Sequence, residues 1–306
     1  MKNNSRFQFV MGDMKKTEQI AAPTYSYWQA VSTQFWGKKG MPFLLFIVLV
    51  VSGVALIQPE ISGYDPRMVP HINDPAKRFL GISWQHPFGT DDVGNSVWDV
   101  VWAGTRTSLV IGFLVTSINT ITGLMVGALW GWSKKIDVIM LEIYHVVAGV
   151  PDVLIITVLM YVLGAGFWQL MLAMCATGWM SVAYFIRTQV IIIRDREYNV
   201  VSKCLGTPTH RIMIKNIFPY LVSVVVSIVA NQIPAAIGAE VMLSYLGIGL
   251  SSETPSLGRM ISKYSNYFMG YPHLFWAPVL TLATVTVSLY VMGQALADAS
   301  DPKKHQ

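Results

Sequence analysis

Charged side chains are scarce in this chain. Asp, Glu, Lys and Arg make up 13% of its 306 residues, whereas a soluble domain is usually about 25% charged. Apolar residues make up 53%, and the charges are clustered, which leaves several apolar runs long enough to cross a ~30 Å hydrocarbon core. These proportions exclude a soluble globular domain and predict an all-α membrane protein. The net charge of +5 is then the basic excess of cytosolic loops, and no nucleic-acid partner is expected.

Cysteine and catalytic motifs are also nearly absent. The two cysteines, Cys175 and Cys204, form no CxxC pair, so a disulfide framework is excluded. The six histidines are scattered, and neither an HExxH zinc motif nor a nucleophile elbow occurs. The Walker A pattern GxxxxGK[ST] is missing as well, so we expect no ATP hydrolysis by this polypeptide. The sequence thus predicts no enzyme, no metal site and no cofactor in this chain.

The apolar runs predict six transmembrane helices. We expect them at about 41–58, 108–132, 137–163, 168–186, 219–250 and 273–297. Since a helix rises ~1.5 Å per residue, the fifth run is too long for one upright span. Either Pro234 kinks it, or Glu240–Leu250 bends back outside. The first run begins only near Met41, after a polar segment, which is not the pattern of a cleavable signal peptide. Glycines at 123, 127 and 131 predict close packing of the second span on a neighbour.

Basic residues orient these spans. With the N-terminus inside, the chain divides into a cytosolic segment 1–40, a first helix 41–58, an extracellular loop 59–105 with an interfacial helix, a core 106–298 with five helices, and a cytosolic tail 299–306. Aromatic residues such as Trp28 and Trp36 predict that part of the first segment lies at the membrane interface. Few of the 22 lysines and arginines then fall outside the cell, namely Arg67, Lys77, Arg78, Arg106, Arg259 and Lys263.

A charged stretch between the fourth and fifth apolar runs predicts a short cytosolic helix within 195–208. It holds good helix formers up to Gly206, and Pro208 blocks its continuation. Pro219 opens the next apolar run, where a helix-starting proline is common. A helix connected at both ends to membrane spans can transmit a movement imposed outside the bilayer to those spans. The plainer interpretation is a basic loop that only sets topology.

The same stretch resembles the coupling loop of ABC-importer permeases. The family's glycine falls on Gly206 and its closing proline on Pro219, while its Glu-Ala-Ala falls on Val200-Val201-Ser202, which lacks the acidic residue. The run from His86 to Trp98 resembles a fingerprint of the C-type permeases of dipeptide and oligopeptide importers. Further likenesses lie at 243–250, 255–258 and 297–302, so the resemblance extends from about His86 to Pro302.

This resemblance implies a type I ABC importer permease fold in a bacterial cell membrane, with six transmembrane helices and both termini cytosolic. The implied partners are a second homologous permease subunit, two cytosolic ATPase subunits that carry ATP and Mg²⁺, and an extracellular binding protein that delivers peptide. The residues expected to couple to the ATPases are Asp195, Arg196, Glu197, Tyr198, Lys203, Gly206, Thr207, Pro208 and Arg211.

Polar residues inside apolar runs are the candidates for a translocation path, because ionisable groups at membrane depth are costly and usually face protein or water. These are Asp152, Asn231, Gln232 and Glu240. Alternatively, Asp152 bonds backbone freed by Pro151, and Glu240 lies at the outer interface. Glu142 and His145 are weaker candidates.

Two other functions stay open from the sequence. A permease of the same family could import nickel or another small solute, because the separate binding protein sets much of the selectivity. A stand-alone secondary transporter or channel would need internal repeats or discontinuous helices in both halves, and the sequence displays no such symmetry.

Overall fold

The computed structural model describes residues 27–68, 74–251 and 253–300. The basic residues Lys2, Arg6, Lys15 and Lys16, and the Asp301-Pro302 end of the last family motif, lie outside the described residues. The described part is helical, with one isolated bridge between Thr90 and Ser96. Its elements are α2 (Tyr27–Gly37), α3 (Met41–Ser62), η1 (Pro75–Lys77), α4 (Val97–Trp132), α5 (Lys134–Ala148), α6 (Asp152–Leu163), α7 (Phe167–Arg194), α8 (Glu197–Cys204), α9 (Thr209–Ile212), η2 (Met213–Ile217), α10 (Phe218–Tyr245), α11 (Leu257–Ser265) and α12 (Pro272–Ser300).

The prediction of a helical membrane protein is confirmed. Five helical segments of the described chain are long and apolar enough to cross a membrane, and a sixth results if α5 and α6 are counted as one span. The third predicted span is therefore not one continuous helix. α5 and α6 meet at 83°, because Pro151 has no amide hydrogen to donate and disfavours helical backbone at Val150 before it.

Several helices extend beyond their predicted bounds. α4 begins at Val97 rather than near Ser108, so the end of the predicted outer loop belongs to the helix. α7 continues to Arg194, eight residues past the predicted end of the fourth span at Ile186. The fifth membrane helix starts at Thr209, before Pro219, passes through a π-helical turn at η2, and continues past Pro234 to Tyr245. Apolar patterning located the membrane-buried parts but not the polar turns that extend them.

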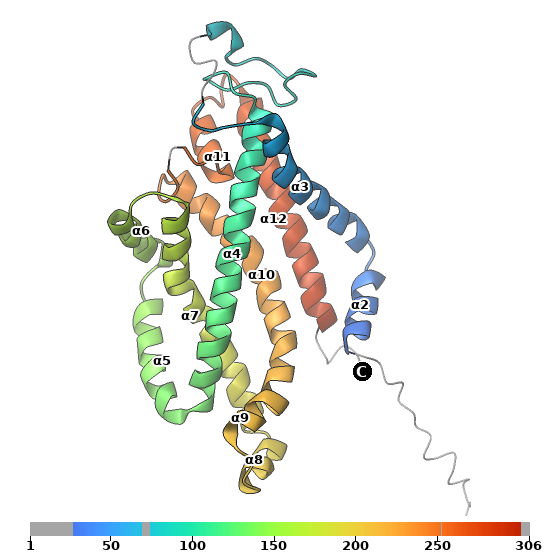
Figure 1. Ribbon diagram of the computed structural model, residues 1–306, viewed down its shortest axis with the longest axis vertical. Helices are drawn as coiled ribbons and strands as arrows, with labels where there is room; N and C mark the ends of the chain where they lie inside the picture. The colour runs from blue at the N-terminus through green and yellow to red at the C-terminus, as the bar shows by residue number, and fades with distance from the viewer. Residues whose placement is uncertain (1–26, 69–73, 252, 301–306) are drawn as a thin grey trace, which may run out of the picture.

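Helix α4 runs through the middle of the bundle, with α7 and α10 beside it (Figure 1). The predicted role of its glycines is confirmed by geometry. A Cβ atom on Gly123 would lie 2.6 Å from the Val182 side chain, and one on Gly127 would lie 2.5 Å from the Ala183 carbonyl oxygen. Because side-chain atoms do not approach backbone that closely, α4 and α7 can pack at this separation only with glycine there.

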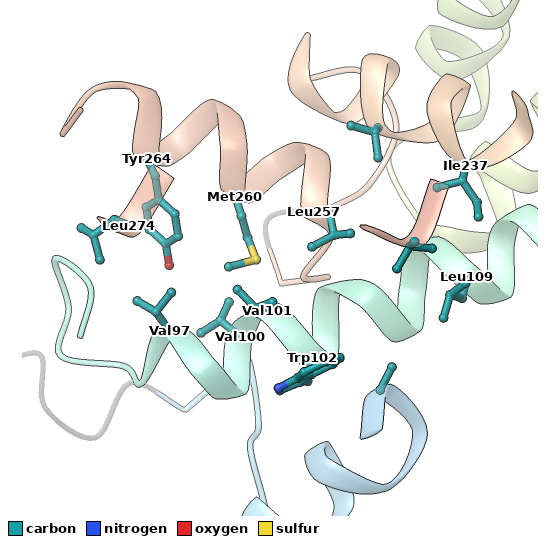
Figure 2. Close-up of a cluster of buried hydrophobic side chains, with 13 residues drawn as sticks. Val97, Val100, Val101, Trp102, Leu109, Ile237, Leu257, Met260, Tyr264 and Leu274 are labelled. Atoms are coloured by element: carbon teal, nitrogen blue, oxygen red, sulfur yellow. The ribbon is translucent and has the colours of Figure 1, made fainter. Parts of the chain in front are cut away.

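The end of the bundle that carries α11 is closed by an apolar core. Figure 2 shows Val97, Val101 and Trp102 of α4 beneath Met260 and Tyr264 of α11. Helix α11 has one strongly apolar face, and this face is buried on α4, α10 and α12. The predicted spans leave residues 251–272 as a loop, and α11 (Leu257–Ser265) occupies the middle of this segment.

Candidate functional site

The short helix α8 lies at one end of the molecule, far from α11 and the loop that precedes α4 (Figure 1). It connects α7 to the helix that begins with α9. A helix was expected within 195–208, and the structure has it at Glu197–Cys204. Asp195 is the C-cap of α7 and Arg196 is the N-cap of α8. Glu197 lies in the first turn of α8, where its carboxylate interacts favourably with the helix dipole.

Arg194 fixes the start of this segment. Its guanidinium contacts both carboxylate oxygens of Asp195, at 2.8 and 2.9 Å, and also donates to the carbonyl oxygen of Gly131 at 2.8 Å. The hydrogen bonds from Arg194 hold the pKa of Asp195 below its usual value. Asp195, one of the predicted coupling residues, is thus paired with Arg194 of the same chain. Arg194 also joins the end of α7 to the end of α4.

The end of α8 is built on Gly206. This residue has φ +80°, a left-handed conformation that glycine adopts without steric cost. Its amide donates to the carbonyl of Lys203, and the Thr207 amide donates to that of Ser202, both at 3.0 Å. The two bonds form a Schellman motif, which satisfies the last carbonyls of the helix. Pro208 then caps α9 and Arg211 is exposed on it, so the predicted stop at Gly206-Pro208 is confirmed.

Asn199 anchors the middle of α8, and sequence reasoning missed it. Its side chain is 2% exposed. The amide nitrogen donates to the carbonyl of Ile193 at 2.8 Å, and the amide oxygen accepts from Asn216 at 2.7 Å. Asn199 therefore joins α8 to the end of α7 and to the π-helical turn before α10. An asparagine inside an otherwise good helix-forming stretch was the available signal.

The opposite side of α8 is open. Tyr198, Val201 and Leu205 are 50%, 56% and 80% exposed. The charged residues Arg196, Glu197 and Lys203 are exposed around them, and Val200 is exposed too. Apolar side chains ringed by charges at the tip of a doubly anchored helix form a surface suited to a protein partner.

A second cluster ties α5 to α7 just inside this end. Arg187 donates to both oxygens of Asp137, at 2.5 and 2.8 Å. Its guanidinium also lies over the rings of Trp130 and Tyr184 at 5.7 and 5.6 Å. Its partners come from α4, α5 and α7, so movement of one of these helix ends is transmitted to the others.

The predicted path residues do not form one cluster. Asn231 and Gln232 line a cavity of about 370 Å³ between α7 and α10, together with Ser181 and Ser227. Asp152 lines a second cavity of about 270 Å³ between the α5–α6 break and α7. Ser181 lines both cavities, so the two adjoin.

Glu240 lies apart from these cavities' walls. It is fully buried and accepts hydrogen bonds from Ser108 of α4 at 2.6 Å and from Ser244 at 2.8 Å. Neither interpretation from the sequence foresaw this position inside the bundle. Ser108 could not be assigned to it from spacing, because Ser108 is far away in sequence, whereas Ser244 is one helical turn after Glu240.

The loop before α4 is fastened to α11 by ion pairs. Lys263 contacts Asp91 at 3.2 Å and Asp92 at 2.5 Å. Burial lowers the pKa of Lys263, but the two carboxylates outweigh burial, and the net pKa lies above its usual value. Tyr264 and Tyr267 add hydroxyl contacts to Asp91 and Asp92. Asp91 and Asp92 belong to the His86–Trp98 fingerprint, which here attaches the loop to α11.

Several known proteins are similar in sequence to this chain. A family described as "Binding-protein-dependent transport system inner membrane component" matches residues 120–306. The oligopeptide transport system permease protein AmiD of Streptococcus pneumoniae (strain ATCC BAA-255 / R6) is 44% identical over 304 residues, 99% of each chain. The oligopeptide permease OppC of Bacillus subtilis (strain 168) is 31% identical over 94% of this chain and 93% of its own. The dipeptide permease DppC of the same organism is 32% identical over 96% and 92%. This multi-pass membrane protein belongs to the family of binding-protein-dependent transport system inner membrane components.

Proposed function

We propose that this chain is a permease subunit of an ATP-driven importer that carries oligopeptides or dipeptides across a bacterial cell membrane. The observation that carries the proposal is α8, an exposed helix anchored through Asn199 to the membrane helices on both sides. The similarity over nearly the whole chain to permeases named for oligopeptide and dipeptide transport supports peptide as the substrate. The chain forms half of the translocation path.

The other half comes from a second, homologous permease subunit. Two ATPase subunits dock in the cytosol on α8 and carry the ATP and Mg²⁺ that this chain does not bind. An extracellular binding protein delivers the peptide at the opposite end, beside α11. Both termini are cytosolic, as α8 is. The docking surface consists of Asp195, Arg196, Glu197, Tyr198, Lys203, Gly206, Thr207, Pro208 and Arg211.

Closure of the ATPases on ATP moves α8 as a unit. The Schellman end at Gly206 and the Asn199 anchor keep the helix intact, so the movement reaches α7 through Ile193 and the fifth membrane helix through Asn216. The Asp137–Arg187 pair passes it to α5. These helices border the cavities lined by Asp152, Asn231 and Gln232, so the path opens alternately to either side. Peptide affinity must differ between the two states for ATP to drive uptake.

Glu240 serves the same path from inside the bundle. Its bond to Ser108 holds α4 to α10 beneath α11, while Ser244 of the same helix donates to its other carboxylate oxygen. Because α11 covers the outer end of these helices, Glu240 sets the position of the outer wall of the path.

The test is uptake by the complete complex in liposomes. Peptide should accumulate only when this chain, the second permease, the ATPases, ATP and the binding protein are all present. Accumulation by this chain alone, without ATPases, would establish a secondary transporter instead. Accumulation of nickel and not of peptides would keep the family and replace the substrate.

A further inference from the structure

We propose that the cavity at the α5–α6 break is a binding site for the free amino terminus of a transported peptide, with Asp152 as the residue that receives the ammonium group. The proposal rests on the proposed function and adds a ligand group and a specificity-determining residue to it. It starts from the cavity of about 270 Å³ whose wall includes Tyr144, Asp152, Thr177 and Ser181.

The charge of this cavity selects a cation. Asp152 is the one ionisable carboxylate in its wall, and no lysine or arginine lines it. Among the described residues no side chain or backbone group pairs with the Asp152 carboxylate, which is exposed in this chain. An unpaired carboxylate on a membrane-spanning segment is costly unless water or a ligand reaches it. Asp152 is thus available to a positively charged ligand.

The neutral groups around Asp152 suit an ammonium ion. An –NH₃⁺ group offers three hydrogens and needs three acceptors. Besides the carboxylate, the Thr177 hydroxyl is buried without a partner in the described part of the chain. The helix break adds a backbone acceptor at Ala148, since the carbonyls of His145 and Val147 accept from Gly149 and Val150 and the bond that a continuous helix would make to Ala148 is interrupted. Ala148, Val150 and Pro151 also line the cavity.

A metal ion fits this set less well. No group of three or more His, Cys, Asp or Glu side chains among the described residues could hold one. A single carboxylate with hydroxyls and carbonyls gives too little charge for a divalent cation, which takes several carboxylate oxygens or a dedicated cage. A monovalent organic cation needs only one compensating charge.

The neighbouring cavity explains why the ammonium would belong to a peptide. The cavity of about 370 Å³ adjoins the first at Ser181 and is lined by the amide side chains Asn231 and Gln232. Side-chain amides donate and accept hydrogen bonds and carry no charge, which matches peptide backbone. A charged end followed by neutral amide partners is the pattern that an extended peptide presents amino terminus first.

Protection of a cysteine at position 181 tests the site in the complete detergent-purified complex. Ser181→Cys is placed in a Cys175→Ala, Cys204→Ser background, and labelling by a small maleimide is followed at increasing concentrations of one peptide, free or N-acetylated. We expect the free peptide to protect Cys at 181 at about a tenfold lower concentration than the acetylated one, the ratio expected from one charge-assisted hydrogen bond. Adding Asp152→Asn should abolish this difference.

Glu142→Gln is the matched control, because Glu142 is an exposed carboxylate on α5 outside the cavity wall, and it should leave the tenfold difference in place. Equal protection by both peptides, protection by neither, or a difference that persists in Asp152→Asn would each overturn the proposal. ATP-driven uptake by the parent complex is measured in parallel. Uptake without amine-dependent protection removes only this site, whereas loss of peptide uptake itself removes the proposed function.

Discussion

Asn216 donates a hydrogen bond of 2.7 Å to the amide oxygen of Asn199 across the turn that carries α8. Asn199 in turn donates to Ile193 at the end of α7. One buried side chain therefore connects the exposed helix to both adjoining membrane helices. In the proposed importer this connection is what converts movement of α8 into movement of the path.

Replacing Asn199 with alanine should uncouple the complex. The change leaves the Asn216 amide without its partner and removes the side-chain bond to the Ile193 carbonyl, which keeps the backbone bond from Arg196. A buried unsatisfied polar group costs about 1–3 kcal/mol. We expect the protein to insert and the ATPases to bind, while peptide uptake per ATP hydrolysed falls severalfold. Ser202→Ala is the control, because the Ser202 hydroxyl bonds only within α8, to the Tyr198 carbonyl. Equal coupling ratios in the two variants would contradict this role.

Gly206 allows a substitution that changes backbone preference alone. A Cβ atom there meets nothing within 4 Å, so a larger side chain causes no clash. Left-handed backbone costs an L-residue about 1–2 kcal/mol, and asparagine tolerates it better than most. Gly206→Val should therefore lower uptake per ATP, and Gly206→Asn should retain most of it. Peptide uptake and ATP hydrolysis are measured on the same samples. A coupling defect lowers uptake per ATP hydrolysed, whereas loss of protein lowers both activities together. Full coupling in Gly206→Val would show that the Schellman end is dispensable.

The pair of Asp137 and Arg187 predicts a stability effect. Their side chains are 23% and 15% exposed, and losing a hydrogen-bonded charged partner in such a partly buried pair costs about 1.5–3 kcal/mol. Asp137→Asn should lower the thermal midpoint of the purified complex by several degrees. Asp137→Asn combined with Arg187→Gln should be less harmful than the sum of the two single changes. Additive effects in this double-mutant cycle would mean that the two side chains do not interact.

The outer fastening predicts a pH dependence. Asp91 and Asp92 raise the pKa of Lys263 in the folded protein. The contribution of Lys263 to folding stability is therefore complete below the ordinary lysine pKa of about 10.4, and it is lost as pH rises through the folded-state pKa. Tyr64 acts in the same direction, because burial and nearby carboxylates raise its pKa to about 12. Hydrogen exchange of α11 should be unchanged between pH 6 and 9 once intrinsic rates are divided out, and protection should fall above about pH 10.

A Lys263→Met variant separates this pair from general alkaline unfolding. Without the ammonium, the buried Asp91 carboxylate loses its cationic partner, so α11 should be less protected already at pH 7. Protection equal to the parent protein at pH 7 would show that the ion pairs do not hold α11 in place.

Apolar run length located the membrane helices because hydrocarbon thickness sets their minimum length. The same patterning could not place their polar ends, so α4 and α7 proved longer than predicted. Glycine and proline chemistry located the end of α8 at Gly206. The break before Asp152 was not predicted, although Pro151 explains it. The anchors were not predictable, because Asn199 with Asn216, Arg187 with Asp137, and Glu240 with Ser108 join residues whose proximity depends on helix packing.

The central claim is that α8 receives force from an ATPase in the cytosol, and Cys204 gives direct access to it. This native cysteine is exposed in the last turn of α8, and Cys175, the other cysteine, is half-buried. A short photoreactive thiol reagent attached to Cys204 in a Cys175→Ala complex should cross-link to an ATPase subunit, with a yield that changes when ATP is added. Labelling of Cys204 from outside intact cells, or a cross-link pattern without any ATPase, would contradict the account.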